Sequence, residues 1–509
     1  MSHWIIAPIL LPLLSAVVMI LLSGRRPLIR ILSFLSVSAL LAISIFLLLL
    51  ASDGQIHLYA LGNWLPPFGV VLVLDRLSAL MLLVTALLAF FSIGYAVRGN
   101  DAPGDKLHAM VQFLLVGVNG AFLTGDLFNL FVFFEVLLIA SYGLLLHGRG
   151  AERARAGLHY VVLNLCGSAL FLIAVSALYG LTGSLNMADM ADKVRQLSPE
   201  DAPLAATAGV LLLVVFGLKA AMAPLYFWLP RAYAAASAPV AAMFAIMTKV
   251  GVYTILRVYV QIFGNDAGNV ANLALPWLWP LALITLVLGL LGALAARELR
   301  VQIAYLVIVS VGTLLAGVAL NSAAALSATL YYLIHSTLIC GVLFLLADLI
   351  LRQRGELLDR ITKGPRLRQS ALLGALFFIA AISVIGMPPL SGFIGKLLLL
   401  NAAGVEANRV LLWVILLAGS LATLMALSRS GSTIFWRTDN RVAAAPAADK
   451  GALLAVIGLL GCILLTTLFA GQVLSYTQAM AEQLLEPQAY SEAMRAFSVY
   501  EGNGKGEAH

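Results

Sequence analysis

The sequence predicts an all-α polytopic membrane protein of about fourteen transmembrane helices, and three observations lead to this fold class. Hydrophobic residues make up 62% of the chain and charged residues only 11%, whereas about 25% of a typical globular protein is charged. Apolar runs of about 18 or more residues recur throughout, and each can cross a hydrocarbon layer about 30 Å thick. Lysine and arginine are distributed unevenly between the loops that join these runs.

The apolar runs set the approximate limits of the expected helices. We expect spans at 4–22, 31–51, 74–97, 107–125, 127–146, 157–182, 205–229, 235–262, 272–296, 300–321, 324–351, 370–402, 409–434 and 450–475. The first run has no basic leader and no small-residue cleavage site, so we interpret it as a retained helix and not as a signal peptide. The seventh and twelfth spans contain Pro224 and Pro388-Pro389. Because proline removes a helical hydrogen bond, both helices should be discontinuous.

The basic residues predict an orientation. Of the 31 lysine and arginine residues, 21 lie in loops on one side of the predicted bundle, 6 on the other side and 4 inside spans. Loops rich in these residues stay in the cytoplasm. We therefore expect a multi-pass protein of the bacterial inner (cell) membrane with both termini on the periplasmic side. The same asymmetry accounts for the net charge of +7, so no nucleic-acid partner is expected.

Two pairs of short segments indicate an internal repeat. Met-Ala-Pro-Leu at 222–225 reappears as Met-Pro-Pro-Leu at 387–390, and Leu-His-Tyr at 158–160 reappears as Leu-Tyr-Tyr at 330–332. Equivalent spans are five apart in order, so they cross the membrane in opposite directions. Inverted repeats of this kind are typical of transporters, with substrate sites beside interrupted helices near the midplane. The alternative is two unrelated proline kinks.

The repeat predicts five parts of the chain. Helices 1–3 occupy 1–106, the first repeat (helices 4–8) 107–262, the second repeat (helices 9–13) 272–434, helix 14 450–475, and a polar C-terminal tail 476–509.

Five ionisable residues lie deep inside the predicted spans, namely Glu135, Lys219, Lys249, His335 and Lys396. A charged group near the bilayer centre costs several kcal/mol unless it is paired or hydrated, so such residues mark candidate ion pathways. Structural alternatives stay open. A lysine can snorkel to the interface, a glutamate can bond a neighbouring helix, and a neutral histidine can bond a backbone carbonyl.

Four further ionisable residues lie near the ends of spans. They are Asp75, Asp126, Asp348 and Arg257. We interpret the three aspartates as interfacial groups, and we expect Arg257 to snorkel towards water.

The chemistry of the five buried residues suits proton transfer. A lysine taken out of water can gain and lose a proton near neutral pH, and histidine titrates there without help. A carboxylate close to a lysine holds it protonated, and withdrawal of the carboxylate releases the proton, so a Glu–Lys pair can act as a switch. We expect a proton relay along successive helices, wetted at the proline breaks.

The cysteines argue against a cofactor or metal site. Cys166, Cys340 and Cys462 are isolated within apolar stretches, and the sequence has no CxxC motif or Cys/His cluster. Zinc, haem and iron–sulfur clusters therefore lack ligands, and we expect no cofactor and no metal.

Four segments of the chain resemble the antiporter-like subunits shared by Mrp-type cation/proton antiporters and respiratory complex I. They are Gly125–Leu144 around Phe-Phe-Glu135, Gly217–Pro230, Thr248–Tyr253 and Gly386–Lys396. The resemblance covers roughly residues 70–435, and it is strongest to the D-type subunits of the Mrp (Mnh/Pha) antiporters.

The resemblance implies a role for each buried residue. Glu135 and Lys219 match the central Glu–Lys pair of the family, and Lys249 matches its connecting lysine. His335 matches the histidine of the eleventh helix, and Lys396 matches the terminal lysine of the exit half-channel.

The sequence departs from the family pattern at two positions. Ser310 stands where many relatives carry His or Gln on helix ten, and Ile339 stands where some carry a lysine. The path beyond Lys249 should therefore depend more on water than in those relatives.

The resemblance implies the proton-translocating subunit of a multisubunit Na+(K+)/H+ antiporter, which is a secondary antiporter subunit and not an enzyme. Its partners would be other membrane subunits, the lipid bilayer, protons and Na+ or K+. Two alternatives stay open. One is an antiporter-like proton-pumping subunit of complex I or a membrane-bound hydrogenase, against which the short polar tail and Lys396 argue in part. The other is a structural scaffold, whose buried charges could be replaced at little cost.

Overall fold

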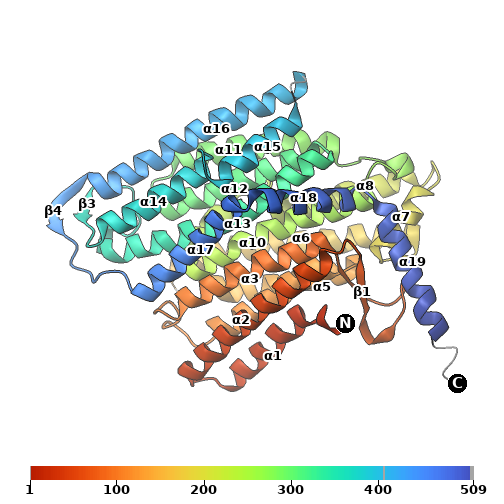
Figure 1. Cartoon of the computed structure of the whole chain (residues 1–509), viewed down its shortest axis with the longest axis horizontal. Coiled ribbons are helices and arrows are strands. Elements are labelled where there is room, and N and C mark those ends of the chain that lie inside the picture. Colours follow the sequence, from red (N-terminus) through yellow and green to blue (C-terminus); the bar gives the residue numbers. More distant parts are fainter. Residues whose placement is uncertain (1, 149, 405–406, 505–509) are drawn as a thin grey trace.

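The computed structural model describes residues 2–148, 150–404 and 407–504, most of which lie in helices packed side by side (Figure 1). Among them, eleven helices are long and apolar enough to cross a membrane. They are α2 (Arg26–Ala51), α3 (Arg76–Ala96), α5 (Leu127–Leu146), α6 (Ala151–Thr182), α8 (Ala202–Ala220), α10 (Ala238–Leu256), α11 (Leu275–Ala295), α12 (Leu299–Ala319), α13 (Ala323–Arg354), α16 (Ala407–Gly431) and α17 (Lys450–Leu468).

Four shorter apolar helices complete the bundle. They are α1 (Ala7–Leu21), α4 (Leu107–Leu123), α14 (Ser370–Ile385) and α15 (Ser391–Ala403). Because α14 and α15 together form one broken span, the described residues contain fourteen spans. The predicted fold class is confirmed.

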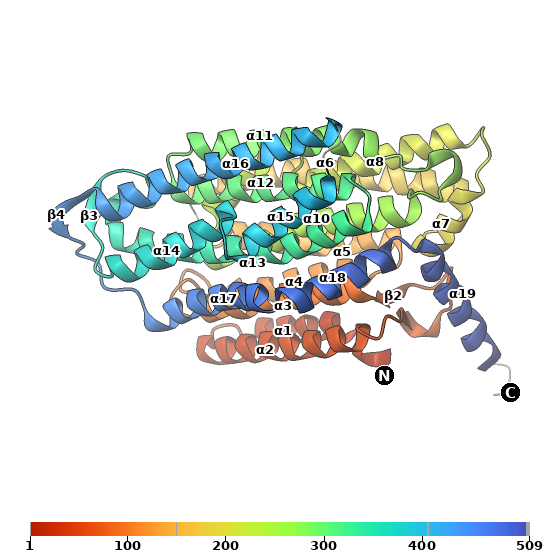
Figure 2. The same ribbon diagram turned by 45° about the horizontal axis from the view of Figure 1, so that its top comes forward.

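The interior of the bundle is formed by α10, α12 and α13. The apolar windows of α10 and α13 are completely buried, and that of α12 is nearly so. Helices α1 and α2 form one edge of the bundle, and α11 and α16 form the opposite edge (Figure 2). The helices with the most protein around them are therefore those that carry Lys249, Ser310 and His335.

Two helices are broken where the sequence places its prolines, as predicted. Helix α8 is followed by Ala221, which caps it with a left-handed backbone (φ 61°), and the chain resumes as α9 (Trp228–Ala235) after Pro224. Helix α14 is followed by Gly386, also left-handed (φ 82°), and α15 begins after Pro388-Pro389. Glycine adopts this conformation without cost, whereas Ala221 is held there by its surroundings.

Two short strand pairs lie in the connections, where an all-α fold was expected. Strand β1 (His57–Ala60) pairs antiparallel with β2 (Val71–Leu74). Strand β3 (Gly364–Arg366), just before α14, pairs parallel with β4 (Thr438–Val442), which follows α16. These pairs satisfy backbone groups where no helix can, and they leave the helical bundle unchanged.

The end of the chain is helical, whereas the sequence predicted a polar tail. Helix α17 stops at Leu468, α18 (Ala470–Leu484) lies against α13, and α19 (Pro487–Gly504) continues to α7 (Met187–Arg195). The reason is an amphipathic pattern, since the buried residues of α18 recur at helical spacing: Thr477, Met480, Ala481 and Leu484. At the far end, Arg495 pairs with Asp192 of α7.

Candidate functional site

Glu135 and Lys219 lie on either side of α6. Glu135, half-buried on α5, accepts a hydrogen bond from the hydroxyl of Ser168 on α6. Lys219, buried in the last turn of α8, donates through Nζ to Asn164 Oδ1 of α6 at 3.3 Å. The two charges interact electrostatically. No direct ion pair joins these two described side chains, and α6 supplies a hydrogen-bond partner to each, so their action as a pair stays a prediction.

The contacts of α6 come from a polar stripe that the sequence analysis missed. Tyr160, Asn164 and Ser168 recur at every fourth residue and therefore share one helix face. Tyr160 bonds the hydroxyl of Ser141 on α5 at 2.8 Å, and Asn164 also donates to the Tyr160 carbonyl. Three polar residues at this spacing within an apolar span were the available signal.

Lys249 is completely buried on α10, and among the described residues its acceptor is a hydroxyl group. Its Nζ donates to Ser310 Oγ of α12 at 3.0 Å, and Ser310 in turn donates to the Val307 carbonyl at 2.7 Å. Ser310 thus contacts the lysine directly, and the dependence on water stays a prediction for the path beyond Ser310. Gly251 permits close packing here, since a Cβ would lie 2.4 Å from the backbone nitrogen of Ala220, beside Lys219.

A small internal cavity lies between helices of the second half of the bundle. Its volume is about 20 Å³, which is room for about one water molecule. Ser310 of α12, His335 of α13 and Lys396 of α15 all line it, together with Tyr332 and Thr423. The structure therefore brings two of the predicted path residues, His335 and Lys396, to one space, and Lys249 reaches that space through Ser310.

Lys396 supplies hydrogen bonds that the broken helix has lost. Its Nζ donates to the carbonyls of Ile385 (2.8 Å) and Val384 (3.3 Å), and to Ser420 Oγ of α16 (3.2 Å). In an uninterrupted helix those carbonyls would accept from residues 388 and 389, which are prolines without an N–H group. The lysine ammonium thus lies at the carboxyl end of α14, where a positive charge is favoured.

His335 is fixed beside this break. Its Nδ1 lies 2.9 Å from Ser391 Oγ, at the start of α15. Gly392 follows, and a Cβ on it would lie 2.0 Å from the Ser383 carbonyl oxygen and 2.8 Å from His335 Nε2. Only glycine lets α15 approach α13 and α14 this closely, so the position of the histidine depends on a residue without a side chain.

A second buried charged group lies away from this path. Arg257 donates through Nη2 to Asp75 at 2.6 Å and through Nε to the Tyr253 hydroxyl at 2.9 Å. Its Nη1 forms an ion pair with the other carboxylate oxygen of Asp75, at 2.5 Å. Both charged side chains are almost fully buried. The interpretation of Asp75 as interfacial and of Arg257 as snorkelling was therefore wrong, since the two residues neutralise each other inside the protein.

This fold, with ionisable groups inside a helical bundle beside two broken helices, defines a polytopic membrane transporter of the antiporter-like class. Residues 124–425 match the family described as "NADH:quinone oxidoreductase/Mrp antiporter, TM". The chain belongs to this family.

Two relatives that match nearly the whole chain are D-type subunits of cation/proton antiporters. The D-type member of a probable K(+)/H(+) antiporter of Rhizobium meliloti (strain 1021) is 41% identical, over 97% of each chain. The D-type member of a Na(+)/H(+) antiporter of Bacillus subtilis (strain 168) is 39% identical, over 97% of this chain and 99% of the relative. The predicted resemblance to the D-type subunits is confirmed.

Solved structures agree with these relatives. A chain of the Mrp complex from Dietzia sp. DQ12-45-1b superposes with a TM-score of 0.86 at 28% identity, covering 97% of this chain and 100% of that one. A chain of respiratory complex I from Thermus thermophilus superposes with a TM-score of 0.79 at 25% identity, covering 94% and 99%. The protein is a multi-pass membrane component of a transporter that assembles with other membrane subunits.

Proposed function

We propose that this chain is the proton-translocating subunit of a multisubunit Na+(K+)/H+ antiporter, and that Glu135, Lys219, Lys249, His335 and Lys396 form its proton relay. The main observation in support is the cavity that Ser310, His335 and Lys396 line together. Lys249 is hydrogen-bonded to Ser310 and so is connected to this cavity. A cavity that has polar groups in its lining and room for about one water molecule can pass a proton between groups that do not touch.

The proposed path starts at Glu135, which is half-buried at the α5–α6 surface. The proton passes to Lys219, whose ammonium Asn164 orients, and then to Lys249 on the adjacent α10. From Lys249 it crosses the cavity to His335 and Lys396. Lys396 is the last group because the break beside it brings an exposed stretch of chain, residues 387–389, close to the path.

Each lysine in this path has a neutral oxygen acceptor and no direct carboxylate partner among the described residues. Such an acceptor holds the ammonium in place without the strong attraction of a full negative charge. Loss of the proton is then easier than from an ion-paired lysine. This arrangement suits repeated protonation and deprotonation.

The antiporter works as a complex and uses an ion gradient, so no chemical reaction is assigned to the chain. The Rhizobium relative is named for K+ and the Bacillus relative for Na+, and both cations are therefore included in the assay. We place the chain in the bacterial cell membrane with both termini on the periplasmic side, as the 21 basic residues on the opposite side support. The parts at 107–262 and 272–434 are proposed as inverted repeats, supported by the matching breaks after Ala221 and Gly386.

The test is cation-dependent proton movement in everted vesicles of a transporter-deficient host. The complete set of antiporter genes should give Na+- or K+-dependent exchange, whereas this gene alone should give an inserted chain without exchange. Glu135→Ala and Lys219→Ala should each abolish exchange in an assembled complex, and Ser310→Thr should exchange faster than Ser310→Ala. Wild-type rates in all of the alanine variants would refute the relay.

A second candidate is an antiporter-like subunit of a redox-driven complex, and the likeness to complex I favours it. The two candidates differ in the energy source. Exchange driven by a cation gradient alone, with no electron donor present, supports the antiporter. Proton movement that requires an electron donor supports the redox-driven complex.

A further inference from the structure

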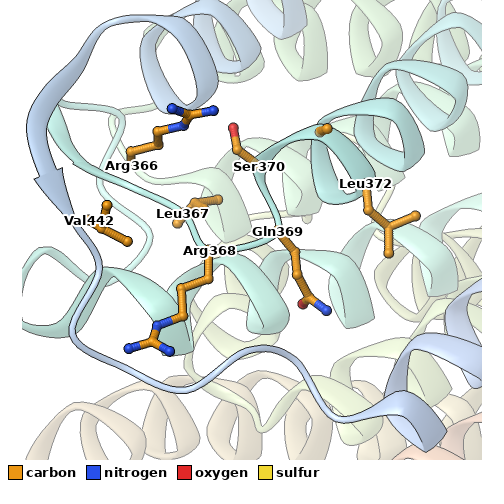
Figure 3. Close-up of a pocket in the computed structure, with 8 residues that line it drawn as sticks. Arg366, Leu367, Arg368, Gln369, Ser370, Leu372 and Val442 are labelled. Atoms are coloured by element: carbon orange, nitrogen blue, oxygen red, sulfur yellow. The ribbon is translucent and has the colours of Figure 1, made fainter.

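A basic pocket lies where the chain enters α14 (Figure 3). The segment from β3 into α14 and the end of β4 enclose a cavity of about 400 Å³. Its lining includes Arg366, Arg368, Gln369, Ser370, Leu372 and Val442. The pocket is at the opposite end of α14 from Lys396, so it is not part of the proton path described above.

The two arginines carry positive charge that the described residues do not neutralise. The guanidinium of Arg366 makes no hydrogen bond or ion pair with any described residue, and Arg368 uses only its Nε, on the Ala443 carbonyl at 3.3 Å. The nearby carboxylate of Asp439 is held by Lys363 at 3.3 Å. The terminal nitrogens of both arginines are left as donors, and a planar guanidinium binds phosphate oxygens in pairs.

Exposed apolar and aromatic side chains beside the pocket indicate that it lies at the edge of the membrane. Leu372 is exposed at the rim, and exposed Ile379 and Ile382 continue its line along the outer face of α14. Trp436, 70% exposed just before β4, stacks on Phe378 with ring centroids 5.1 Å apart. Tryptophan is enriched at the level of lipid headgroups. A charged pocket that opens onto an apolar helix face matches a molecule with an anionic head and a hydrocarbon chain.

We propose that this pocket binds the phosphate group of an anionic phospholipid. The Arg366 and Arg368 side chains point to opposite sides of the segment in Figure 3, so one of these long side chains turns when the phosphate binds and both then contact its oxygens. The acyl chain lies along Leu372, Ile379 and Ile382. Basic pockets at the cytoplasmic ends of membrane helices recognise lipid headgroups in this way. Free phosphate has the same head chemistry but would make no use of the apolar face.

The test is lipid retention by the purified, assembled complex, measured by native mass spectrometry after addition of phosphatidylglycerol. The double variant Arg366→Gln/Arg368→Gln should retain one phosphatidylglycerol fewer than the wild-type complex. Arg155→Gln removes an exposed arginine elsewhere on the same basic side and should retain the wild-type number. The double variant Arg366→Lys/Arg368→Lys keeps the charge but loses paired hydrogen bonds, and it should be intermediate. If the glutamine variant does not assemble, the number of lipids retained by the Arg366→Lys/Arg368→Lys variant, compared with the wild type, tests the proposal.

Two competition arms on the wild-type complex distinguish the sources of phosphate. Phosphatidylcholine, whose head has no net charge, should not displace the bound lipid, and neither should 10-fold more inorganic phosphate than lipid. Equal retention by the wild type and both arginine variants would overturn the proposal. Displacement by inorganic phosphate would also overturn it, because the site would then bind a free anion and not a lipid.

Discussion

Lys396 Nζ lies 2.8 Å from the carbonyl oxygen of Ile385, where a proline occupies the position that would normally donate. One ammonium group therefore closes the end of α14 and also faces the cavity shared with His335. The structural and proton-transfer roles of this lysine can be separated by substitution, because arginine keeps the donors but does not release a proton.

Lys396→Arg should assemble with near-wild-type thermal stability and lose exchange. Lys396→Met should lose exchange and also thermal stability. The loss of stability follows because each buried carbonyl left without a donor costs about 1–3 kcal/mol. Proton exchange in vesicles and the melting temperature of the purified complex measure the two effects. An active Lys396→Arg variant would show that this group does not titrate during turnover.

Asn164→Leu should reduce exchange at least about tenfold, which corresponds to about 1.4 kcal/mol in the barrier. The reason is that Lys219 would lose its acceptor on α6. Cys166→Ala, two residues further along and exposed on the outer side of the same helix, is the matched control and should leave the rate unchanged. If the two variants behave alike, Asn164 has no part in the path.

Gly392→Ala should disrupt assembly or exchange, because the new methyl group would meet the Ser383 carbonyl at 2.0 Å and His335. Gly461→Ala on α17 adds the same group where no atom lies within 4 Å. That control should be neutral or stabilise by up to about 1 kcal/mol through helix propensity. Subunit abundance in membranes and exchange rate measure the outcome, and a fully active Gly392→Ala would contradict the packing argument.

Arg257→Met should destabilise the protein by about 3–5 kcal/mol, because Asp75 would remain buried without its partner. The double variant Asp75→Asn/Arg257→Met removes both charges, and the asparagine can still accept from the Ser78 amide at the start of α3. It should therefore be more stable than the single variant. Thermal unfolding of the complex compares them, and equal loss in both would indicate that Arg257 acts through contacts other than Asp75.

Much of the fold could be predicted from the sequence because the bilayer fixes the length of each helix. Both helix breaks could be placed because Pro224, Pro388 and Pro389 lack the donors that a helix needs. The short strands could not, since three to five residues in a loop carry no periodic pattern. The helical tail could have been recognised from its spacing of buried residues in α18.

The candidate site was predicted as a set of residues and not as a set of contacts. The depth of Lys219 within its span indicates that it is buried. The sequence does not reveal which face of α6 turns towards it, so the prediction did not include Asn164 as its hydrogen-bond acceptor. Asp75 and Arg257 are 182 residues apart, and each is close to a helix end in sequence. Only the packing of α3 against α10 shows that they meet, because position along a helix does not reveal what lies beside it.

The complete burial of α10 and α13 has a consequence for how such a protein could change over time. Lys249 and His335 are insulated from lipid and from any neighbouring subunit, whereas Glu135 is half-exposed at the α5–α6 surface. A change of membrane composition or of partner would therefore act on the entrance of the path and leave its middle segment intact. The same interior could serve in assemblies that draw on different driving forces, with adaptation confined to the periphery.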